Sequence, residues 1–538
     1  MSHDFFMGKV FFMLYGKTIS ACLHGVEGRL IEVEVDLSNG LPQVNIVGLP
    51  DNAVKESIER VRAAIKNCGF SFPLQRITIN MAPADIRKEG SAFDLAIALG
   101  ILATSGQLPP GTLDDTLVIG ELSLDGSIRP VPGVLSMMEA AVKGGLSRVI
   151  VPAGNAEEAG WISGCTVQAV SHLAEWSRTP PDSPALAVTG TLVPQASASM
   201  PAQAAYTDDY ADVRGQSHVK RALMISAAGM HNLMLIGPPG TGKTMLAKRL
   251  PSILPSMDER ESLEVTKIYS VSGKFADRSR LVRERPFRMP HHTISAAGLV
   301  GGGGVPKPGE ISLAHRGVLF LDELPEFSRA ALEVLRQPME DRFVTIGRAK
   351  AVYQFPAHFL LVASMNPCPC GSGHWGIEAD GGDISCVCSP LKVMQYRSRI
   401  SGPLLDRMDL HVEVPRVPYS QLACQEPPLS SLTMRETVER THQLQLERYR
   451  QSGLMFNSEL NGRLLREHCQ LDAAASSLLE KSFQALGMSV RSHDRILKIA
   501  RTIADMEGMR DIAGHHVAEA LQYRCLDKRQ TLRSLPPA

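Results

Sequence analysis

The sequence predicts a multidomain α/β protein with an N-terminal α+β domain, a central P-loop α/β domain and a C-terminal α-helical domain. Three observations lead to this prediction. The chain has 538 residues, which is more than one hydrophobic core normally organises. A complete phosphate-binding loop at residues 237–244 stands between an apolar strand and a helix. Beyond about residue 434, apolar residues recur every three or four positions, which is typical of helices.

Composition excludes some classes of protein. The chain is 44% hydrophobic and 21% charged, as in ordinary soluble proteins. Its 56 Lys and Arg balance its 56 Asp and Glu, so a nucleic-acid partner has to be argued from local patches. We find neither a secretory signal nor a run of ~20 apolar residues. We therefore expect a cytoplasmic protein with no membrane partner, and its ten cysteines fit a reducing compartment.

The N-terminal domain mixes strand and helix patterns. Residues 31–36 alternate apolar and polar side chains, and a turn at Asn39-Gly40 leads into residues 44–47, which predicts a β-hairpin. Residues 52–67 have helical spacing and end near Gly69, which predicts a capped helix. A strand at 77–79, a helix at 93–103 and a strand at 149–151 follow.

Changes in composition predict the domain boundaries. Residues 1–12 form a possible N-terminal extension, and residues 13–177 form the α+β domain. Residues 178–207 are rich in Pro, Ser, Ala and Thr and show no periodicity, which predicts a flexible linker. We assign residues 208–420 to the α/β domain, because strand and helix patterns alternate there, and residues 421–538 to the helical domain.

The phosphate-binding loop predicts a nucleotide site. Its glycines allow backbone N–H groups to surround phosphate oxygens, its lysine neutralises phosphate charge, and its hydroxyl is a ligand for Mg²⁺. We therefore expect ATP and Mg²⁺ as cofactors. The loop residues are Gly237, Pro238, Pro239, Gly240, Thr241, Gly242, Lys243 and Thr244.

Two further strands end in polar residues that belong to such a site. Residues 317–321 are apolar and run into Asp322 and Glu323, which we assign to Mg²⁺ and to the attacking water. Residues 359–363 lead to Asn366, at the edge where parallel sheets bind ligands. An Asn-Pro pair is also a common turn signal, so the local pattern leaves both interpretations of Asn366 open.

The order of these motifs, together with Leu404-Leu-Asp-Arg407 and a helical C-terminus, resembles an AAA+ ATPase. More narrowly, the chain resembles the YifB/ComM family of magnesium-chelatase-like proteins. The segments that carry this resemblance cover nearly the whole chain: 44–51, 288–295, 364–371 and 396–407. Members of this family usually begin near Met13.

The resemblance implies a homo-oligomer, a hexameric ring in which Lys243, Thr244, Asp322, Glu323 and Asn366 act within one subunit. It implies that Arg407 acts on the neighbour's nucleotide and that Arg495 is the sensor of the helical lid, with Arg491 as its rival. Taken singly, each arginine is an ordinary helix residue. The family further implies DNA as substrate, with branch-migration helicase activity in recombination or transformation, and no small-molecule substrate beyond ATP.

Local sequence offers candidate DNA contacts. Five arginines lie between residues 278 and 288, and such a cluster is either a solvated face or a phosphate contact. Residues 301–309 read as a mobile Gly-rich insertion with Lys307, and residues 343–353 as a hairpin with Arg348 and Lys350 at its tip. Both resemble the pore loops of the AAA+ branch shared with MCM helicases, where six copies would form a positive funnel.

The first domain resembles the Lon protease domain, which has a ribosomal protein S5 domain 2-like fold. Residues 120–135 match the segment that carries the Lon catalytic lysine, and residues 87–92 match the segment with its serine. A Ser–Lys dyad needs an amine to accept the serine proton, but Leu135 occupies the lysine position. We therefore predict no peptidase activity, and a role as an oligomerisation or DNA-facing collar.

Four cysteines form two close pairs, Cys368 with Cys370 and Cys386 with Cys388. Four thiolates suit tetrahedral Zn²⁺, with His374 as a weaker fifth candidate. The Cys-x-Cys spacing is less familiar than Cys-x-x-Cys, so free thiols or a redox pair stay open. Bound zinc would have a structural role beside Asn366.

Three other functions compete with a DNA motor. The ATPase subunit of a magnesium-chelatase-type complex normally lacks a Lon-like domain and needs a partner with a metal-dependent adhesion module. An ATP-dependent protease is disfavoured by Leu135. Only the cations of the two loops argue against a protein-remodelling AAA+ chaperone.

Overall fold

The protein is described from a computed structural model that covers residues 15–177, 191–192, 208–274, 281–304, 306–348, 351–371, 386–417, 429–524 and 526. The predicted extension 1–12 and most of the predicted linker lie outside these residues. The chain forms two compact units. The first unit contains residues 1–202 with 266–281 and 303–307, and the second contains the rest of the chain.

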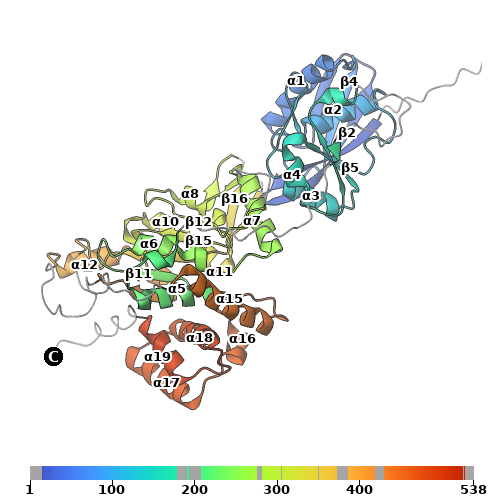
Figure 1. The fold of residues 1–538 in the computed structure, drawn as a ribbon. Helices are drawn as coiled ribbons and strands as arrows, with labels where there is room; N and C mark the ends of the chain where they lie inside the picture. Colours follow the sequence, from blue (N-terminus) through green and yellow to red (C-terminus); the bar gives the residue numbers. More distant parts are fainter. Residues whose placement is uncertain are drawn as a thin grey trace, which may run out of the picture. The chain divides into compact units, whose positions relative to one another are not determined.

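The first unit is built on a mixed eight-stranded sheet in the order β10-β9-β8-β5-β1-β2-β4-β3 (Figure 1). Strands β1, β2 and β4 pair antiparallel, whereas β5, β8 and β9 pair parallel. The strands are β1 (Tyr15–His24), β2 (Glu27–Ser38), β3 (Gln43–Val47), β4 (Arg76–Ala82), β5 (Thr116–Val118), β8 (Arg148–Pro152), β9 (Thr166–Val170) and β10 (Thr191–Leu192), with a small separate ribbon of β6 (Glu121–Leu122) and β7 (Ile128–Arg129). β10 falls within the predicted linker and was not foreseen.

The helices of the first unit follow the sequence pattern closely. The predicted helix at 52–67 is α1 (Asn52–Asn67), with the Asp51 side chain accepting from the Val54 N–H at 2.8 Å. Gly69 adopts φ +82°, a left-handed conformation that favours glycine after a helix. The other helices are α2 (Asp94–Thr104), α3 (Val134–Lys143) and α4 (Ala156–Ala159).

The predicted hairpin between residues 31 and 47 is wrong. Both segments are strands, but β4 lies between them: β2 pairs antiparallel with β4, and β3 pairs parallel with β4. The reason is the α1 crossover, which returns the chain beside β3 in the parallel direction. Ile77, Ile79 and Met81 of β4 are completely buried, so their burial favours an interior position for this strand.

The second unit contains a parallel five-stranded sheet in the order β12-β15-β18-β11-β19. Its strands are β11 (Leu233–Ile236), β12 (Phe287–Arg288), β15 (Val318–Leu321), β18 (Leu360–Met365) and β19 (Leu410–Glu413). The first strand in the chain, β11, lies between the last two. The strand order therefore reverses at β11, where open α/β sheets bind ligands.

Helices lie around this sheet (Figure 1). Two short ribbons are separate from it. The ribbons are β13 (Gly301–Gly302) with β14 (Lys307–Pro308), and β16 (Phe343–Arg348) with β17 (Ala351–Pro356). The second ribbon is the predicted hairpin, and the structure confirms it. The helices are α5 (Ser217–Gly229), α6 (Lys243–Lys248), α7 (Glu259–Ser272), α8 (Ala296–Val300), α9 (Glu310–Leu313), α10 (Arg329–Glu333), α11 (Arg336–Asp341), α12 (Pro390–Arg397) and α13 (Gly402–Leu405). Lys307 of β14 and residues 266–272 of α7 belong to the first unit.

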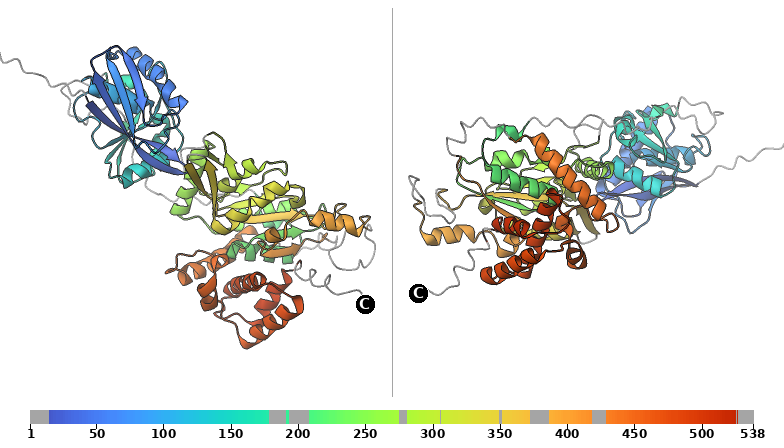
Figure 2. Two further views of the ribbon diagram at one scale, coloured as in Figure 1. Left: turned by 180° about the vertical axis from the view of Figure 1, so that it is seen from behind. Right: turned by 60° about the horizontal axis from the view of Figure 1, so that its bottom comes forward.

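The C-terminal region is helical, as predicted. It consists of α15 (Ser431–Arg448), α16 (Gly462–His468), α17 (Ala473–Leu486), α18 (Val490–Met506) and α19 (Gly514–Gln522), drawn in orange and red in Figure 2. These helices share one hydrophobic core with the parallel sheet, in which Met434 and Ile496 belong to the same buried cluster as Leu235 and Phe320. The helical region and the sheet therefore form one compact unit.

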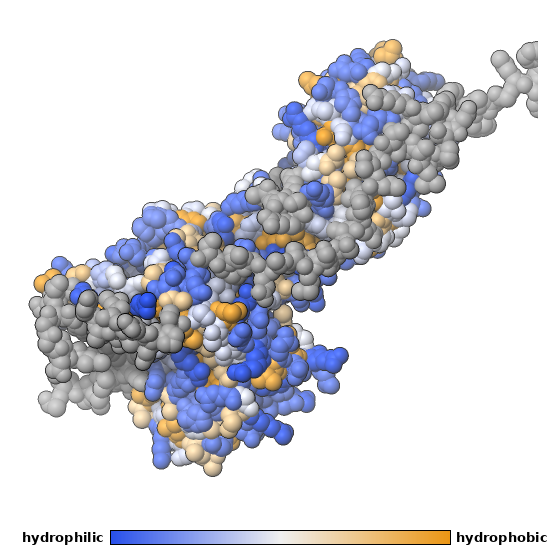
Figure 3. Space-filling view, in the orientation of Figure 1, coloured by the Kyte–Doolittle hydropathy of each residue, from blue (hydrophilic) through white to orange (hydrophobic). Residues whose placement is uncertain are grey.

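The coloured part of the face drawn in Figure 3 is mainly hydrophilic. On the face drawn in Figure 3, apolar residues are scattered among hydrophilic ones. Among the described residues, no helix is both long and apolar enough to cross a lipid bilayer.

Candidate nucleotide-binding site

The phosphate-binding loop connects β11 to α6, as the sequence predicts. Gly240 and Gly242 adopt φ of +79° and +86°, which side chains other than glycine rarely tolerate. A Cβ on Gly237 would lie 2.2 Å from the Val414 carbonyl oxygen, so this position also requires glycine. The loop is therefore shaped by its glycines into a turn whose backbone leads directly into a helix N-terminus.

Lys243 lies at the centre of the site. Its Nζ donates to the carbonyl oxygens of Gly237 at 2.7 Å and Pro238 at 2.8 Å, and to Asn366 Oδ1 at 3.2 Å. Burial lowers the pKa of Lys243, and the nearby carboxylates of Asp322 and Glu323 oppose that shift. The contact with Asn366 joins the loop to the end of β18, as expected for neighbouring parallel strands.

The two acidic residues follow β15 directly. Thr244 Oγ1 donates to Asp322 Oδ2 at 2.7 Å, so one hydroxyl and one carboxylate meet as oxygen ligands of the kind Mg²⁺ prefers. Glu323 adopts φ +53°, a strained conformation of the kind that clusters at functional sites. These residues fit a Mg²⁺–nucleotide complex.

Sequence reasoning missed Ser364. Its buried hydroxyl donates to Asp322 Oδ1 and accepts the backbone N–H of Glu323 at 3.1 Å. Ser364 thus holds both acidic residues from the neighbouring strand. The available signal was a single serine within the otherwise apolar segment Leu360–Met365.

The two candidate arginines lie in a different place. Arg407 and Arg495 both line a cavity of about 280 Å³, together with Lys498, Asp409 and Glu340 among other residues. None of the described residues that line this cavity comes from the phosphate-binding loop. Arg495, which the family resemblance implies to be the sensor of the helical lid, lines the same cavity as Arg407.

Arg407 and Arg495 each pair with a carboxylate in this cavity. Arg407 pairs with Glu340 and donates to the Pro403 carbonyl at 2.6 Å. Arg495 Nε lies 3.1 Å from Asp409 Oδ1, and Asp409 Oδ2 also accepts the Asn232 backbone N–H at 2.9 Å. The rival sensor residue, Arg491, is exposed near the start of α18 and does not line the cavity.

Family models and related proteins match most of the chain. Three family models match in sequence order: subunit ChlI of Mg-chelatase over residues 33–155, magnesium chelatase subunit ChlI over 209–422, and its C-terminal part over 428–524. Competence protein ComM of Haemophilus influenzae is 44% identical over 503 residues, which cover 93% of this chain and 96% of ComM. Protein YifB of Escherichia coli is 42% identical over 510 residues, with 94% and 96% covered.

The chain belongs to the YifB/ComM family of magnesium-chelatase-like AAA+ proteins. A third, shorter match concerns Lon protease 2 of Bacillus subtilis, which is 28% identical over 145 residues and covers 24% of this chain and 26% of that protease. The family models and the relatives support an AAA+ ATPase of this family.

The candidate DNA contacts of this YifB/ComM-family protein are only partly described. Lys307 is exposed on β14, and Arg348 is exposed at the end of β16. A Cβ on Gly302 would lie 3.8 Å from Arg348 Nη2, so β13 and the hairpin of β16 and β17 are close neighbours. Lys350 lies outside the described residues.

Two arginines of the basic cluster at 278–288 form ion pairs within the second unit, whereas Arg283 is exposed. Arg285 is buried and forms an ion pair with Glu261 at 3.0 Å, and Arg288 pairs with Glu310 at 2.6 Å. Both arginines therefore serve internal contacts of the second unit. Arg278 and Arg280 lie outside the described residues.

The Lon-like segments of the first unit can also be located. Leu135 is fully buried in α3, and Ser91 donates a hydrogen bond to Glu121. The nearby Lys88 is fully buried and donates to the Pro83 carbonyl, and burial lowers its pKa. The structure brings the four cysteines of the predicted zinc site together, whereas His374 lies outside the described residues.

Proposed function

We propose that this AAA+ ATPase is a ring-shaped, ATP-driven motor on DNA, in which each ATP site is completed by a neighbouring subunit. One observation carries the proposal. The phosphate-binding loop gathers Lys243, Thr244, Asp322 and Asn366 at one sheet edge, while Arg407 and Arg495 line a separate cavity. A hydrolysing site needs a cation for the charge that develops on the γ-phosphate. We assign this role to Arg407, acting on the nucleotide of another copy of the chain, and the role of lid sensor to Arg495.

The contacts of Arg407 support a role in assembly. Its Nε is buried and has no hydrogen-bond partner among the described residues, which is costly for a charged group. Its remaining contacts are to Glu340 and the Pro403 carbonyl. A phosphate of a neighbouring subunit would satisfy this group, because guanidinium groups bind phosphate with paired hydrogen bonds.

The roles within one subunit follow from the contacts. Thr244 and Asp322 would hold Mg²⁺, which would neutralise charge on the β- and γ-phosphates. Lys243 would exchange its contacts with Gly237 and Pro238 for phosphate oxygens. Glu323 would polarise the attacking water, and Asn366, already bonded to Lys243, would orient the γ-phosphate and that water.

Two features support DNA as the substrate. The ribbon of β13 and β14 and the hairpin of β16 and β17 carry exposed cations, Lys307 and Arg348. In a hexameric ring, six copies of these loops and of Lys350 would form a positive funnel for a phosphate backbone. The name of the relative ComM, a competence protein, is consistent with branch migration or helicase activity during DNA uptake and recombination.

The first unit has a supporting role in this proposal. Leu135 cannot accept a proton, so we infer that this domain is not a peptidase and acts as a collar for assembly or for DNA.

The test measures the ATPase rate with and without single-stranded and branched DNA. We expect DNA to raise the rate of the wild type. The Arg348→Ala/Lys350→Ala variant should lose this stimulation and keep its basal rate. The control is Arg463→Ala, because Arg463 on α16 has a side chain that is 90% exposed. A rate that responds to no DNA would refute the motor, and stimulation by unfolded protein instead would favour a chaperone.

A further inference from the structure

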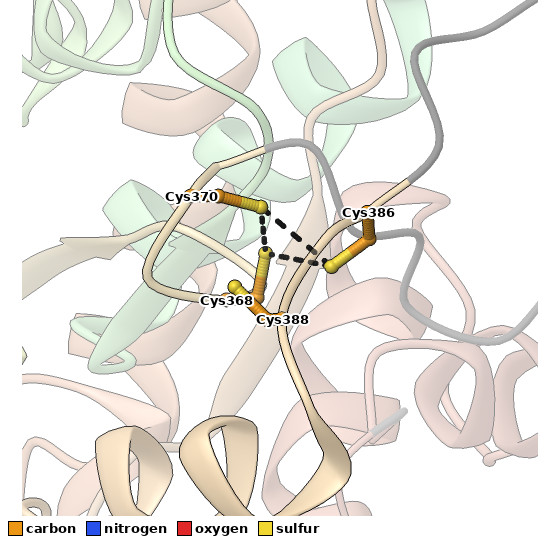
Figure 4. Close-up of side chains that lie close together, drawn as sticks. All are labelled: Cys368, Cys370, Cys386 and Cys388. Carbon is orange, nitrogen blue, oxygen red and sulfur yellow. Dashed lines mark hydrogen bonds between the residues drawn. The ribbon is translucent and has the colours of Figure 1, made fainter.

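The four-cysteine cluster is formed by two short segments of the second unit. Cys368 and Cys370 follow β18, and Cys386 and Cys388 precede α12 (Figure 4). Their four Sγ atoms lie within 4.8 Å of one another. The Sγ–Sγ distances are 3.2 Å from Cys368 to Cys370, 3.6 Å from Cys368 to Cys386, and 3.6 Å from Cys370 to Cys386.

These distances distinguish between the possible uses of the thiols. A disulfide requires about 2.05 Å between sulfur atoms, so none of these pairs is bonded. Four sulfur ligands at about 2.3 Å from a tetrahedral Zn²⁺ lie about 3.8 Å apart. The observed separations are close to that edge length. The fold therefore places four thiols at the corners of a site of the right size for one zinc ion.

Hydrophobic burial does not explain why the cysteines gather. Cys368 is buried, but Cys370 and Cys386 are exposed and Cys388 is only partly buried. Thiols form weak hydrogen bonds with one another, so four of them at a surface gain little from meeting. A metal ion supplies the missing attraction, because structural zinc sites contribute directly to the free energy of folding.

We propose that Cys368, Cys370, Cys386 and Cys388 bind one Zn²⁺ ion as a closed, structural tetrathiolate site. Binding releases the thiol protons to solvent and leaves four thiolates around the ion. No electron transfer is involved, because Zn²⁺ has no redox chemistry. All four tetrahedral positions are filled by protein ligands, so this ion is not a catalytic metal.

The cysteine cluster lies next to Asn366 of the nucleotide site. Asn366 stands two residues before Cys368, and the intervening Pro367 carbonyl accepts two hydrogen bonds from Arg397 of α12, at 3.0 and 3.3 Å. A Cβ on Gly371 would lie 2.7 Å from Pro239 Cδ of the phosphate-binding loop. The segment from Asn366 to Gly371 is thus packed between α12 and that loop.

Zinc would therefore hold Asn366 in place against Lys243. The ion would join the segment 366–371 to the residues just before α12. At the last residue of α12, Arg397 bonds the Pro367 carbonyl and so joins the helix to the same segment. This part of the inference rests on the proposed role of Asn366 in hydrolysis. The binding of zinc itself does not rest on it.

Zinc content tests the site without reference to ATP. We expect the full-length chain, purified without added metal, to contain about one zinc per chain by elemental mass spectrometry. The Cys386→Ser and Cys388→Ser variants should lose most of it, because serine is a poor zinc ligand. The matched control is Cys165→Ala, which removes a buried thiol of the first unit and should keep the metal.

Cobalt gives a second measurement that does not depend on the variants. Replacing the metal with Co²⁺ should produce the visible absorption bands of a tetrahedral cobalt thiolate. Absence of zinc from the wild type, iron in its place, or a Cys370–Cys386 disulfide in protein kept under reducing conditions would each overturn the site.

The ATPase assay tests whether bound zinc positions Asn366, separately from whether zinc binds. If zinc holds Asn366, removal of the metal by a chelator should lower kcat at least about tenfold, which corresponds to about 1.4 kcal/mol. Added Zn²⁺ should restore it in the wild type and not in Cys386→Ser. An unchanged kcat after zinc loss would overturn the link to Asn366. A wild type that binds zinc but never hydrolyses ATP would instead refute the proposed function.

Discussion

The strongest prediction concerns Ser364, whose hydroxyl joins the two acidic residues of the ATP site. It donates to Asp322 and accepts the Glu323 backbone N–H at 3.1 Å. Replacement by alanine removes one oxygen atom and leaves both groups without this partner. Such a loss costs about 1–3 kcal/mol for a buried group.

The cost should appear in kcat. Asp322 keeps its hydrogen bond from Thr244, but the strained backbone at Glu323, with φ +53°, loses its anchor. If the full penalty is expressed in the transition state, kcat should fall about 5- to 150-fold, at about 1.4 kcal/mol per factor of ten. The KM for ATP should stay nearly unchanged, because Lys243 and the phosphate-binding loop are untouched.

Steady-state ATPase kinetics of Ser364→Ala measure both quantities, and fluorescent-nucleotide binding measures affinity separately. Ser312→Ala is the matched control. Ser312 is also fully buried, but its hydroxyl has no hydrogen-bond partner among the described residues, so kcat should be unaffected. A kcat for Ser364→Ala equal to that of the control, or a raised KM with normal kcat, would refute the positioning role of Ser364.

Three further predictions address the site, the assembly and the pH dependence of stability. Lys243→Ala should abolish nucleotide binding, because it removes the amine that donates to the Gly237 and Pro238 carbonyls and that we expect to neutralise phosphate charge; residual affinity in a binding titration would contradict this. Lys243→Ala and Arg407→Ala should each be inactive alone, yet regain ATPase activity when mixed, because about one quarter of random interfaces combine an intact loop with an intact arginine. Failure of every mixture would place Arg407 in its own subunit's site. Burial lowers the pKa of His442 to about 4, so the unfolded chain binds a proton between about pH 6.5 and 4 that the folded chain excludes. The resulting stability is complete above pH 6.5 and is lost as the pH falls to 4, by about 3 kcal/mol at most. His442 stacks on Phe456 with ring centroids 4.6 Å apart, so His442→Phe should fold at pH 7 and show a weaker loss of stability in acid; equal pH curves would count against this assignment.

The sequence predicted an element correctly where the residues that determine its structure all lie within that element. The helix at 52–67 is such a case, since its apolar spacing and its cap are local. The phosphate-binding loop is another, because Gly240 and Gly242 dictate its turns. The hairpin prediction failed because strand pairing depends on where α1 returns the chain, and no residue between 31 and 47 encodes that.

The sequence by itself determined that this chain binds nucleotide, which residues form the loop, where the acidic strand end lies, and to which family the chain belongs. Only the tertiary structure decided that Ser364 joins Asp322 to Glu323, that Arg407 and Arg495 share a cavity, and that two cysteine pairs meet beside the phosphate-binding loop. The physical reason is the separation along the chain of the residues that interact. Glycine conformation and helix spacing act over a few residues, whereas these contacts exist only after the tertiary fold brings distant segments together, as the parallel pairing of β15 and β18 does for Asp322 and Ser364.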